Sequence, residues 1–153
     1  IIIGVLSAVA LPNLLSQVGK ARETEMKNAA GTVNRTQQAY HFEKQSFAQA
    51  TPSGTSVTDG QLTTLGVTLP TEYIDTVTVV GNNAGSASVQ VANTDSANDG
   101  TRPYSGGIEH NAGQYDQVLC QANEVGNSLA APSLDTDGSI ADTDCGTNAS
   151  AIN

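Results

Sequence analysis

The chain has 153 residues, the length of a single domain, and a formal net charge of −9 at pH 7. Residues 1–50 carry five Lys or Arg and three Asp or Glu, whereas residues 51–153 carry one Arg and twelve Asp or Glu. So acidic a distal part excludes direct binding to nucleic acid, because contacts with the phosphate backbone need cations.

The first fifteen residues, IIIGVLSAVALPNLL, are the most apolar part of the chain. Eleven of the fifteen are apolar and none is charged. A helix needs about 20 apolar residues to span a bilayer, so this run is too short, and no basic region precedes it as in a signal peptide. We expect the inner part of a longer segment that begins before Ile1, buried in a membrane or against copies of itself. A buried core helix of a globular domain is the alternative.

One helix is expected from Ile1 to about Ser46, apolar over residues 1–15 and amphipathic over residues 16–47. Its apolar side chains recur at helical spacing, at Val18, Met26, Ala29, Ala30, Val33, Tyr40 and Phe47. Pro12 removes a backbone hydrogen bond and clashes with the preceding turn, which predicts a kink or a locally unwound stretch near it.

Charged residues follow the apolar run. Glu23 and Lys27 stand in the favourable i, i+4 order, and Arg22 and Glu25 at i, i+3, which predicts two ion pairs along the helix. The excess of basic residues after the apolar run could contact lipid headgroups. Ordinary solvent-exposed charges on a helix explain this excess equally well.

Strand patterns fill the second half of the chain. Alternating, β-branched runs predict strands at 74–80 and 86–91, and weaker signals predict strands at 103–108 and 114–120. A connecting loop with a helical turn near 61–65 precedes them, and residues 123–153 show little periodicity. One long helix followed by neighbouring strands indicates the α+β class with an antiparallel sheet.

Cys120 and Cys145 are the only cysteines and enclose 24 residues rich in Asp, Gly, Ser and Asn. We expect a disulfide, since closing such a loop removes about 3–3.5 kcal/mol of chain entropy from the unfolded state. Two free thiols are the alternative. No ligand spacing typical of zinc is present.

Catalytic motifs are absent, so neither an enzyme nor a cofactor is predicted. His41 and His110 are expected to be surface or packing residues. Asp135, Asp137 and Asp142 are weak calcium candidates, because carboxylate oxygens suit calcium but the EF-hand order is not met. An Asp/Gly turn is the alternative there.

Two stretches resemble a known family. Ile1 to Asn13 resembles the inner part of the N-terminal segment of type IV pilins, with Gly4 and Pro12 at the family's two helix-weakening positions. Gly19 to Glu23 and Asn34 to Tyr40, with Phe47 and Ala48 after them, most resemble major pilins of cyanobacteria. The family's acidic residue and N-methylated aromatic residue near the mature N-terminus do not occur here, so no assembly glutamate is assigned. The resemblance is looser farther on, where Thr64 to Val67, Leu69 and Pro70 are similar to the loop after the pilin helix.

The resemblance implies the pilin ladle fold: a long N-terminal helix packed on a four-stranded antiparallel sheet, with a C-terminal loop bounded by Cys120 and Cys145. Residues 1–50 would be the assembly helix and residues 51–153 the globular head. Asn34 begins a glycosylation sequon, but we expect it to be partly buried in a filament. The implied filament-core residues are Ile1, Ile2, Ile3, Gly4, Val5, Leu6, Ala8, Val9, Leu11, Pro12, Leu14 and Leu15, with Gly4 and Pro12 as points where the helix loosens.

The resemblance also implies a function. The chain would be the major pilin of a type IV pilus, a surface filament used in motility and adhesion, with DNA uptake as a further use. Its partners would be other pilin subunits, the inner membrane before assembly, and the assembly and retraction machinery. A pseudopilin of a type II secretion system is the alternative, and a membrane-tethered binding domain or enzyme is a third.

Overall fold

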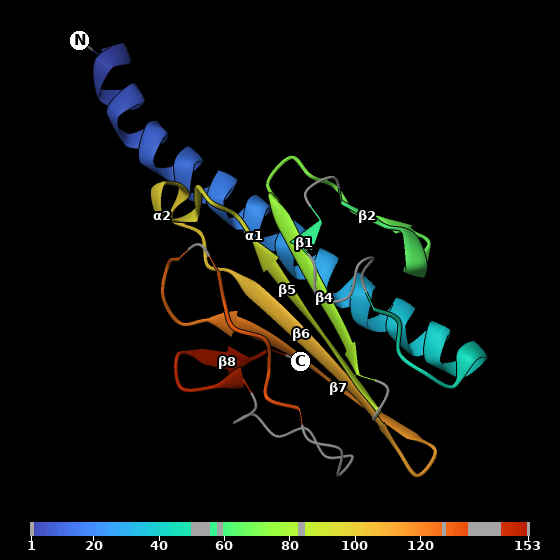
Figure 1. Cartoon of the computed structure of the whole chain (residues 1–153). Helices are drawn as coiled ribbons and strands as arrows, with labels where there is room; N and C mark the ends of the chain where they lie inside the picture. Colours follow the sequence, from blue (N-terminus) through green and yellow to red (C-terminus); the bar gives the residue numbers. More distant parts are fainter. Residues whose placement is uncertain are drawn as a thin grey trace.

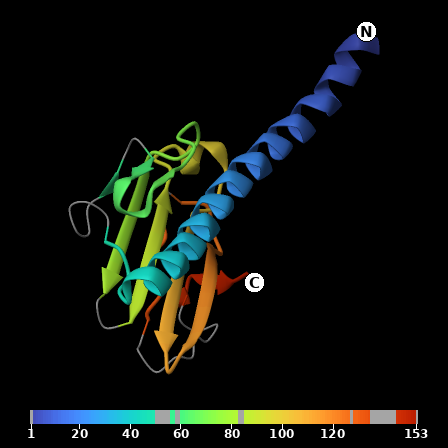
Figure 2. The ribbon, with the colours of Figure 1, turned by 90° about the vertical axis from the view of Figure 1, so that its right-hand side faces the viewer.

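The computed structural model describes residues 2–49, 56–57, 60–82, 85–126, 128–134 and 145–152. Of residues 2–3, 5–16, 56–57, 61 and 82 it describes the backbone alone. One long helix, α1 (Ile2–Lys44), lies across one face of an antiparallel sheet, and its N-terminal turns run beyond the sheet (Figures 1 and 2).

The sheet has six strands in the order β1-β4-β5-β6-β7-β8, and β2 and β3 form a separate hairpin. In chain order the elements after α1 are β1 (Ser56–Val57), β2 (Gln61–Leu62), the 3₁₀ turn η1 (Thr63–Leu65), β3 (Val67–Thr68), β4 (Thr76–Asn82), β5 (Ser86–Ala92), α2 (Ser96–Asp99), β6 (Tyr104–Asn111), β7 (Gln114–Ala122) and β8 (Ala149–Ala151).

The core lies between α1 and the sheet. Helix side chains at i, i+3, i+4 and i+7 share one face; here they are Met26, Ala29, Ala30 and Val33, all buried. They pack against strand and loop residues that are also buried, namely Leu62, Leu69, Ile74, Val77, Val79, Val89, Val91 and Tyr104. The amphipathic pattern of the sequence therefore predicted the buried face of the helix, except that Val18 is 40% exposed and Tyr40 is half-buried and lies outside this core.

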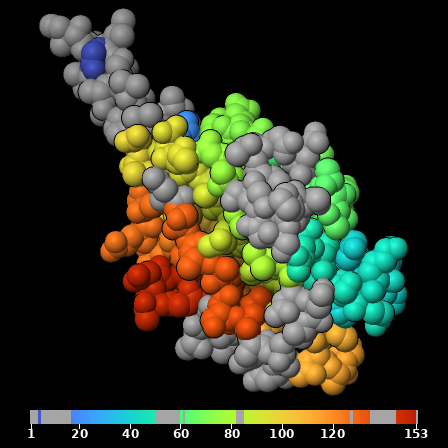
Figure 3. Space-filling view, in the orientation of Figure 1, coloured from blue at the N-terminus to red at the C-terminus, as the bar shows by residue number. Residues whose placement is uncertain are grey.

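Two neighbouring glycines of β6 show that both faces of the sheet are covered. Successive strand residues point to opposite faces. A side chain at Gly106 would meet Asn34 of α1, whereas one at Gly107 would meet Leu134. The segment 128–134 therefore lies on the face opposite the helix, and Figure 3 shows that face with the residues after β7 beside α2.

The α+β class and the long helix packed on an antiparallel sheet are confirmed. The four strands expected from the sequence are β4, β5, β6 and β7. The sheet has six strands rather than four, because β1 pairs with β4 at one edge and β8 pairs with β7 at the other. These two strands have two and three residues, too few to give an alternating pattern.

Helix α1 is continuous through Gly4 and Pro12. The unwound stretch expected near Pro12 is therefore not present in the single chain. The long helical run after Pro12 is already nucleated, which favours propagation through one missing hydrogen bond. Loosening at Gly4 and Pro12 within a filament stays a prediction. The helix ends at Lys44 because Gln45 takes a left-handed conformation with φ of 56°.

Candidate functional site: the helix, its contacts with the head and the groove beside it

In the N-terminal half of α1, none of the side chains that the structure describes is buried. From Gln17 onward the first buried side chain is Met26. Gly4 is exposed, and a side chain there would meet no atom within 4 Å. Of the other expected filament-core residues, Ile1 lies outside the described residues, and only the helical backbone is described for Ile2, Ile3, Val5, Leu6, Ala8, Val9, Leu11, Pro12, Leu14 and Leu15.

A cluster of polar contacts fixes the helix where it meets the top of the sheet. Arg102 donates to the carboxylate of Glu23 from its backbone N–H at 3.0 Å, from Nε at 3.2 Å and from Nη2 at 3.3 Å. These contacts with Glu23 raise the pKa of Arg102 above its usual value. Glu23 is thus held by Arg102 of the head, and not by Lys27 as the spacing predicted, because Arg102 offers two guanidinium donors in one plane and its backbone N–H as a third donor.

The second expected helix pair is also replaced by a contact with the head. Arg22 forms an ion pair with Asp99 of α2, and its guanidinium lies 4.7 Å from the ring centroid of Tyr73. The Asp99 carboxylate raises the pKa of Arg22. Sequence spacing suggested Glu25 as its partner, but a carboxylate in the short α2 turn lies closer to the guanidinium.

Asn34 holds the middle of the helix to the sheet. Its side chain is almost fully buried, and Nδ2 donates to the carbonyls of Gly107 and Val118, each at 3.1 Å. Gly106 makes this approach possible, because a Cβ there would lie 2.9 Å from Nδ2. Asn34 is therefore a helix-to-sheet contact, and its sequon is inaccessible in the folded head.

Gln37 holds the chain after the helix. Its Nε2 donates to the carbonyl of Ala48 at 2.6 Å, and its Oε1 accepts from the Ala48 N–H at 2.9 Å. Both polar atoms of the buried Gln37 amide therefore have a hydrogen-bond partner, as buried polar groups generally do. It fixes the direction in which the chain leaves the helix.

Four aromatic rings pack together near the C-terminal end of α1. His41 lies 4.4 Å from the ring centroids of both Phe47 and His110, and the centroids of His110 and Tyr115 are 4.6 Å apart. His41 Nδ1 is 2.8 Å from Tyr115 Oη. Burial, and then the charge of His110, lower the pKa of His41. His41 and His110 are thus packing residues, as the sequence suggested.

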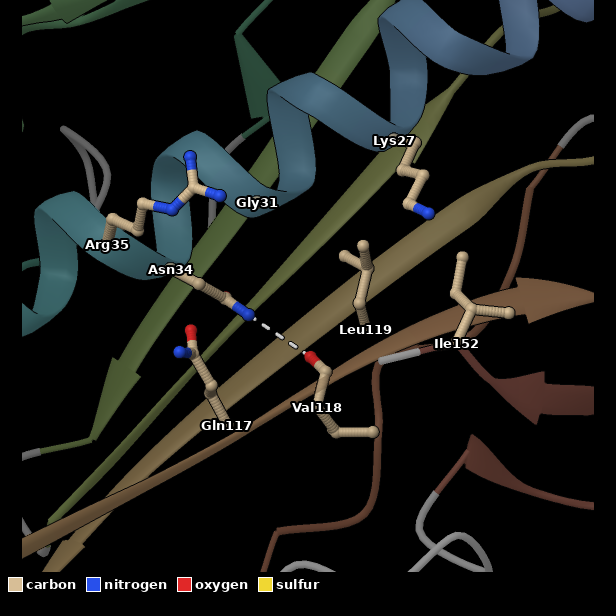
Figure 4. A pocket seen from close by; sticks show the side chains of 8 residues that line it. All are labelled: Lys27, Gly31, Asn34, Arg35, Gln117, Val118, Leu119 and Ile152. Atoms are coloured by element: carbon tan, nitrogen blue, oxygen red, sulfur yellow. Dashed lines mark hydrogen bonds between the residues drawn. The ribbon is translucent and has the colours of Figure 1, made fainter.

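A groove of about 400 Å³ runs between α1 and the β7–β8 edge of the sheet. Figure 4 shows the residues that line it: Lys27, Gly31, Asn34 and Arg35 from the helix, Gln117, Val118 and Leu119 from β7, and Ile152 after β8. Lys27 and Arg35 are exposed, whereas Asn34 and Val118 are buried beneath them. The groove therefore combines two cations with a partly apolar floor.

Cys120 and Cys145 form a disulfide, with their Cα atoms 5.5 Å apart. Both are buried, in a cluster with Val118, Ala122 and Leu129. The bond joins β7 to the chain just before β8, and β8 pairs with β7 at Cys120. It thereby fixes the edge of the sheet beside the groove. The expected disulfide is confirmed.

A comparison with protein families decides the identity of this fold. The family model described as type IV pilin-like G and H matches residues 23–146. The chain belongs to this type IV pilin-like family. No curated protein and no solved structure gave a match. The matched range includes Glu23, Asn34 and Gln37 of the helix–head contacts, the groove residues other than Ile152, and both cysteines, whereas Arg22 lies just before it.

The calcium candidates of this pilin-like protein, Asp135, Asp137 and Asp142, lie outside the described residues, so calcium binding there stays a prediction. Within the part of the chain that the structure describes, no three His, Cys, Asp or Glu side chains gather as a metal site would need. In the same part, no helix combines the length and the apolar character that crossing a membrane requires.

Sequence reasoning missed the polar contacts that position the pilin helix. Asn34 was noticed as a sequon, and Gln37 was not singled out. Their partners lie up to 84 positions away along the chain, so no local pattern marks them. The one available signal was a polar residue on an otherwise apolar helix face, beside Val33.

Proposed function

We propose that this pilin-like chain is the major subunit of a type IV pilus, with residues 1–15 in the filament core. The observation that carries the proposal is α1 itself, whose N-terminal turns extend beyond the head (Figure 2). The sequence of those turns is apolar and uncharged. Burial of such a surface is strongly favoured over exposure to water, so lipid covers it before assembly and helices of neighbouring subunits cover it afterwards.

Small residues support close packing of these helices. Gly4, Ser7, Ala8 and Ala10 allow backbones to approach one another, as in membrane helix pairs. Gly4 and Pro12 lower the cost of loosening the helix, which would let each subunit adjust to its neighbours in the filament. The resemblance of Asn34 to Tyr40 to cyanobacterial major pilins favours a major pilin over a pseudopilin.

This function places the protein in a filament outside the cell, with an inner-membrane stage before assembly. The pilus would serve motility and adhesion, together with assembly and retraction proteins. DNA uptake would need another subunit for the contact with DNA, because the head carries a large excess of acidic residues.

Electron microscopy of sheared cell-surface material tests the proposal. We expect long fibres in cells with the intact gene and none in a deletion strain. Val9→Asp should also abolish fibres, because a charge in an apolar helix core is costly, whereas Asn28→Asp on the exposed helix face should not. Fibres that persist in the deletion strain would contradict the proposal, and a secretion defect without surface fibres would indicate the pseudopilin alternative.

A further inference from the structure

The cations of this chain are distributed in an unusual way. Of the six Lys and Arg residues, Arg22 and Arg102 are paired with Asp99 and Glu23. The remaining four are Lys20, Lys27, Arg35 and Lys44, all exposed and all on α1. Within the described residues none of these four forms an ion pair. The chain therefore presents its unpaired positive charge on one helix and its excess of negative charge on the head.

Two of the four cations flank the groove beside β7. Lys27 and Arg35 are eight positions apart, about two helical turns, and so lie on the same side of α1. Gly31 stands between them, and a Cβ there would meet no atom within 4 Å, so the space between the two cations is open. Leu119 and Ile152, both half-buried, form the apolar part of the groove (Figure 4).

We infer that this groove receives an acidic surface segment of a second copy of this chain. The inference rests on the proposed filament and names one contact within it. Charge complementarity argues for a second copy, because residues 51–153 carry twelve acidic residues and a single Arg, which is already paired. The groove and the acidic surface are different parts of the molecule, and a contact between unlike surfaces can repeat without closing into a ring.

The contact is made by side chains rather than by strand addition. The N–H of Gln117 in β7 already donates to Asp116 Oδ1 at 2.8 Å. An incoming strand would have to displace that bond at the very edge it needs. Carboxylates that approach Lys27 and Arg35 displace nothing, because neither cation has a partner in the described part of the chain.

A charge-reversal experiment on the full chain in its own cells tests the contact. Lys27→Glu with Arg35→Glu reverses the groove. Lys20→Glu with Lys44→Glu is the matched control, because it makes the same change of net charge on the same helix away from the groove. We expect the ratio of sheared fibre to total protein to fall about tenfold in the first pair, as two lost ion pairs allow, and to change little in the control.

The outcomes are distinct. Normal fibre yield in the groove variant overturns the inference, and so does an equal loss in both pairs, which would reflect helix charge alone. If the unaltered protein forms no fibres, the proposed function itself has failed. Total protein and its disulfide, read from a non-reducing gel, report whether each variant has folded.

A second variant fills the groove without changing its charge. Gly31→Leu should reduce the fibre ratio because its side chain occupies the space between Lys27 and Arg35. Gly31→Ala is its control and should leave the ratio unchanged, since the added methyl group is small. Equal fibre yields from both Gly31 variants would overturn the inference.

Discussion

At the scale of single residues, the junction of helix and sheet depends on polar side chains in apolar surroundings. Asn34 and Gln37 are both nearly fully buried, and each donates to backbone carbonyls. A buried amide with its partners costs little, whereas the same group without partners is expensive. Such hydrogen bonds fix the position of the helix along the sheet. Apolar contacts alone are non-directional and would allow several positions.

Replacing Asn34 should therefore destabilise the head. Asn34→Ala removes both hydrogen bonds to Gly107 and Val118 and leaves a void at Gly106, so we expect a loss of about 1–3 kcal/mol in the free energy of unfolding. Denaturant unfolding of the full chain in detergent measures this. Asn28→Ala, on the exposed face of the same helix, is the control and should change stability by less than half as much.

His41 makes stability depend on pH. Its pKa is lowered from 6.5 by burial and by the charge of His110. The unfolded chain then binds more protons than the folded one at mildly acidic pH, so stability is complete above 6.5 and decreases as the pH falls through 6.5 toward the folded pKa.

We expect the melting temperature of the protein to fall between about pH 7.5 and about pH 5.5. His41→Gln should give a flatter profile over this range, because glutamine does not titrate. Parallel profiles for the two proteins would show that other groups cause the pH dependence.

At the scale of elements, local pattern was informative where elements are long. The alternating runs at 74–80 and 86–91 predicted β4 and β5. The apolar stripe predicted the buried face of α1. Strand β8 was missed because its three residues owe their conformation to pairing with β7. The expected pairs of Glu23 with Lys27 and Arg22 with Glu25 were wrong for a related reason: spacing on a helix does not reveal Arg102 or Asp99 across the fold.

Among the features at this scale, we expect removal of the disulfide to lower the stability of the fold most. Cys120→Ser opens a link between residues 25 positions apart and removes about 3–3.5 kcal/mol of stabilisation in the chain-entropy model. We expect less protein to accumulate and fewer fibres to form, as measured by immunoblot and by sheared-fibre yield. Cys145→Ser should reproduce the effect, and normal, fully assembled fibres from either variant would refute a structural role for the bond.

At the scale of the whole molecule, charge and apolar surface are separated along one axis. The N-terminal turns of α1 are apolar, the exposed face of its second half carries Lys27, Arg35 and Lys44, and the head is acidic. In the proposed filament, the apolar helix turns of neighbouring copies would pack together, and the basic groove of one copy would face the acidic head of another. This ordering of charge can be predicted from the sequence, but the groove cannot, because it joins residues 27–35 to residues 117–119 and 152, which only the fold brings together.

The contact between Asn34 and Val118 also sets an order of events during synthesis. The helix is made first, yet the carbonyls that hold it belong to strands made near the end of the chain, 73 and 84 positions later. Contacts so distant in sequence form slowly. The helix therefore cannot form these two hydrogen bonds until β6 and β7 have been made, although it can pack on β4 and β5 earlier. That interval leaves its apolar turns free to enter a lipid phase before the head has taken shape.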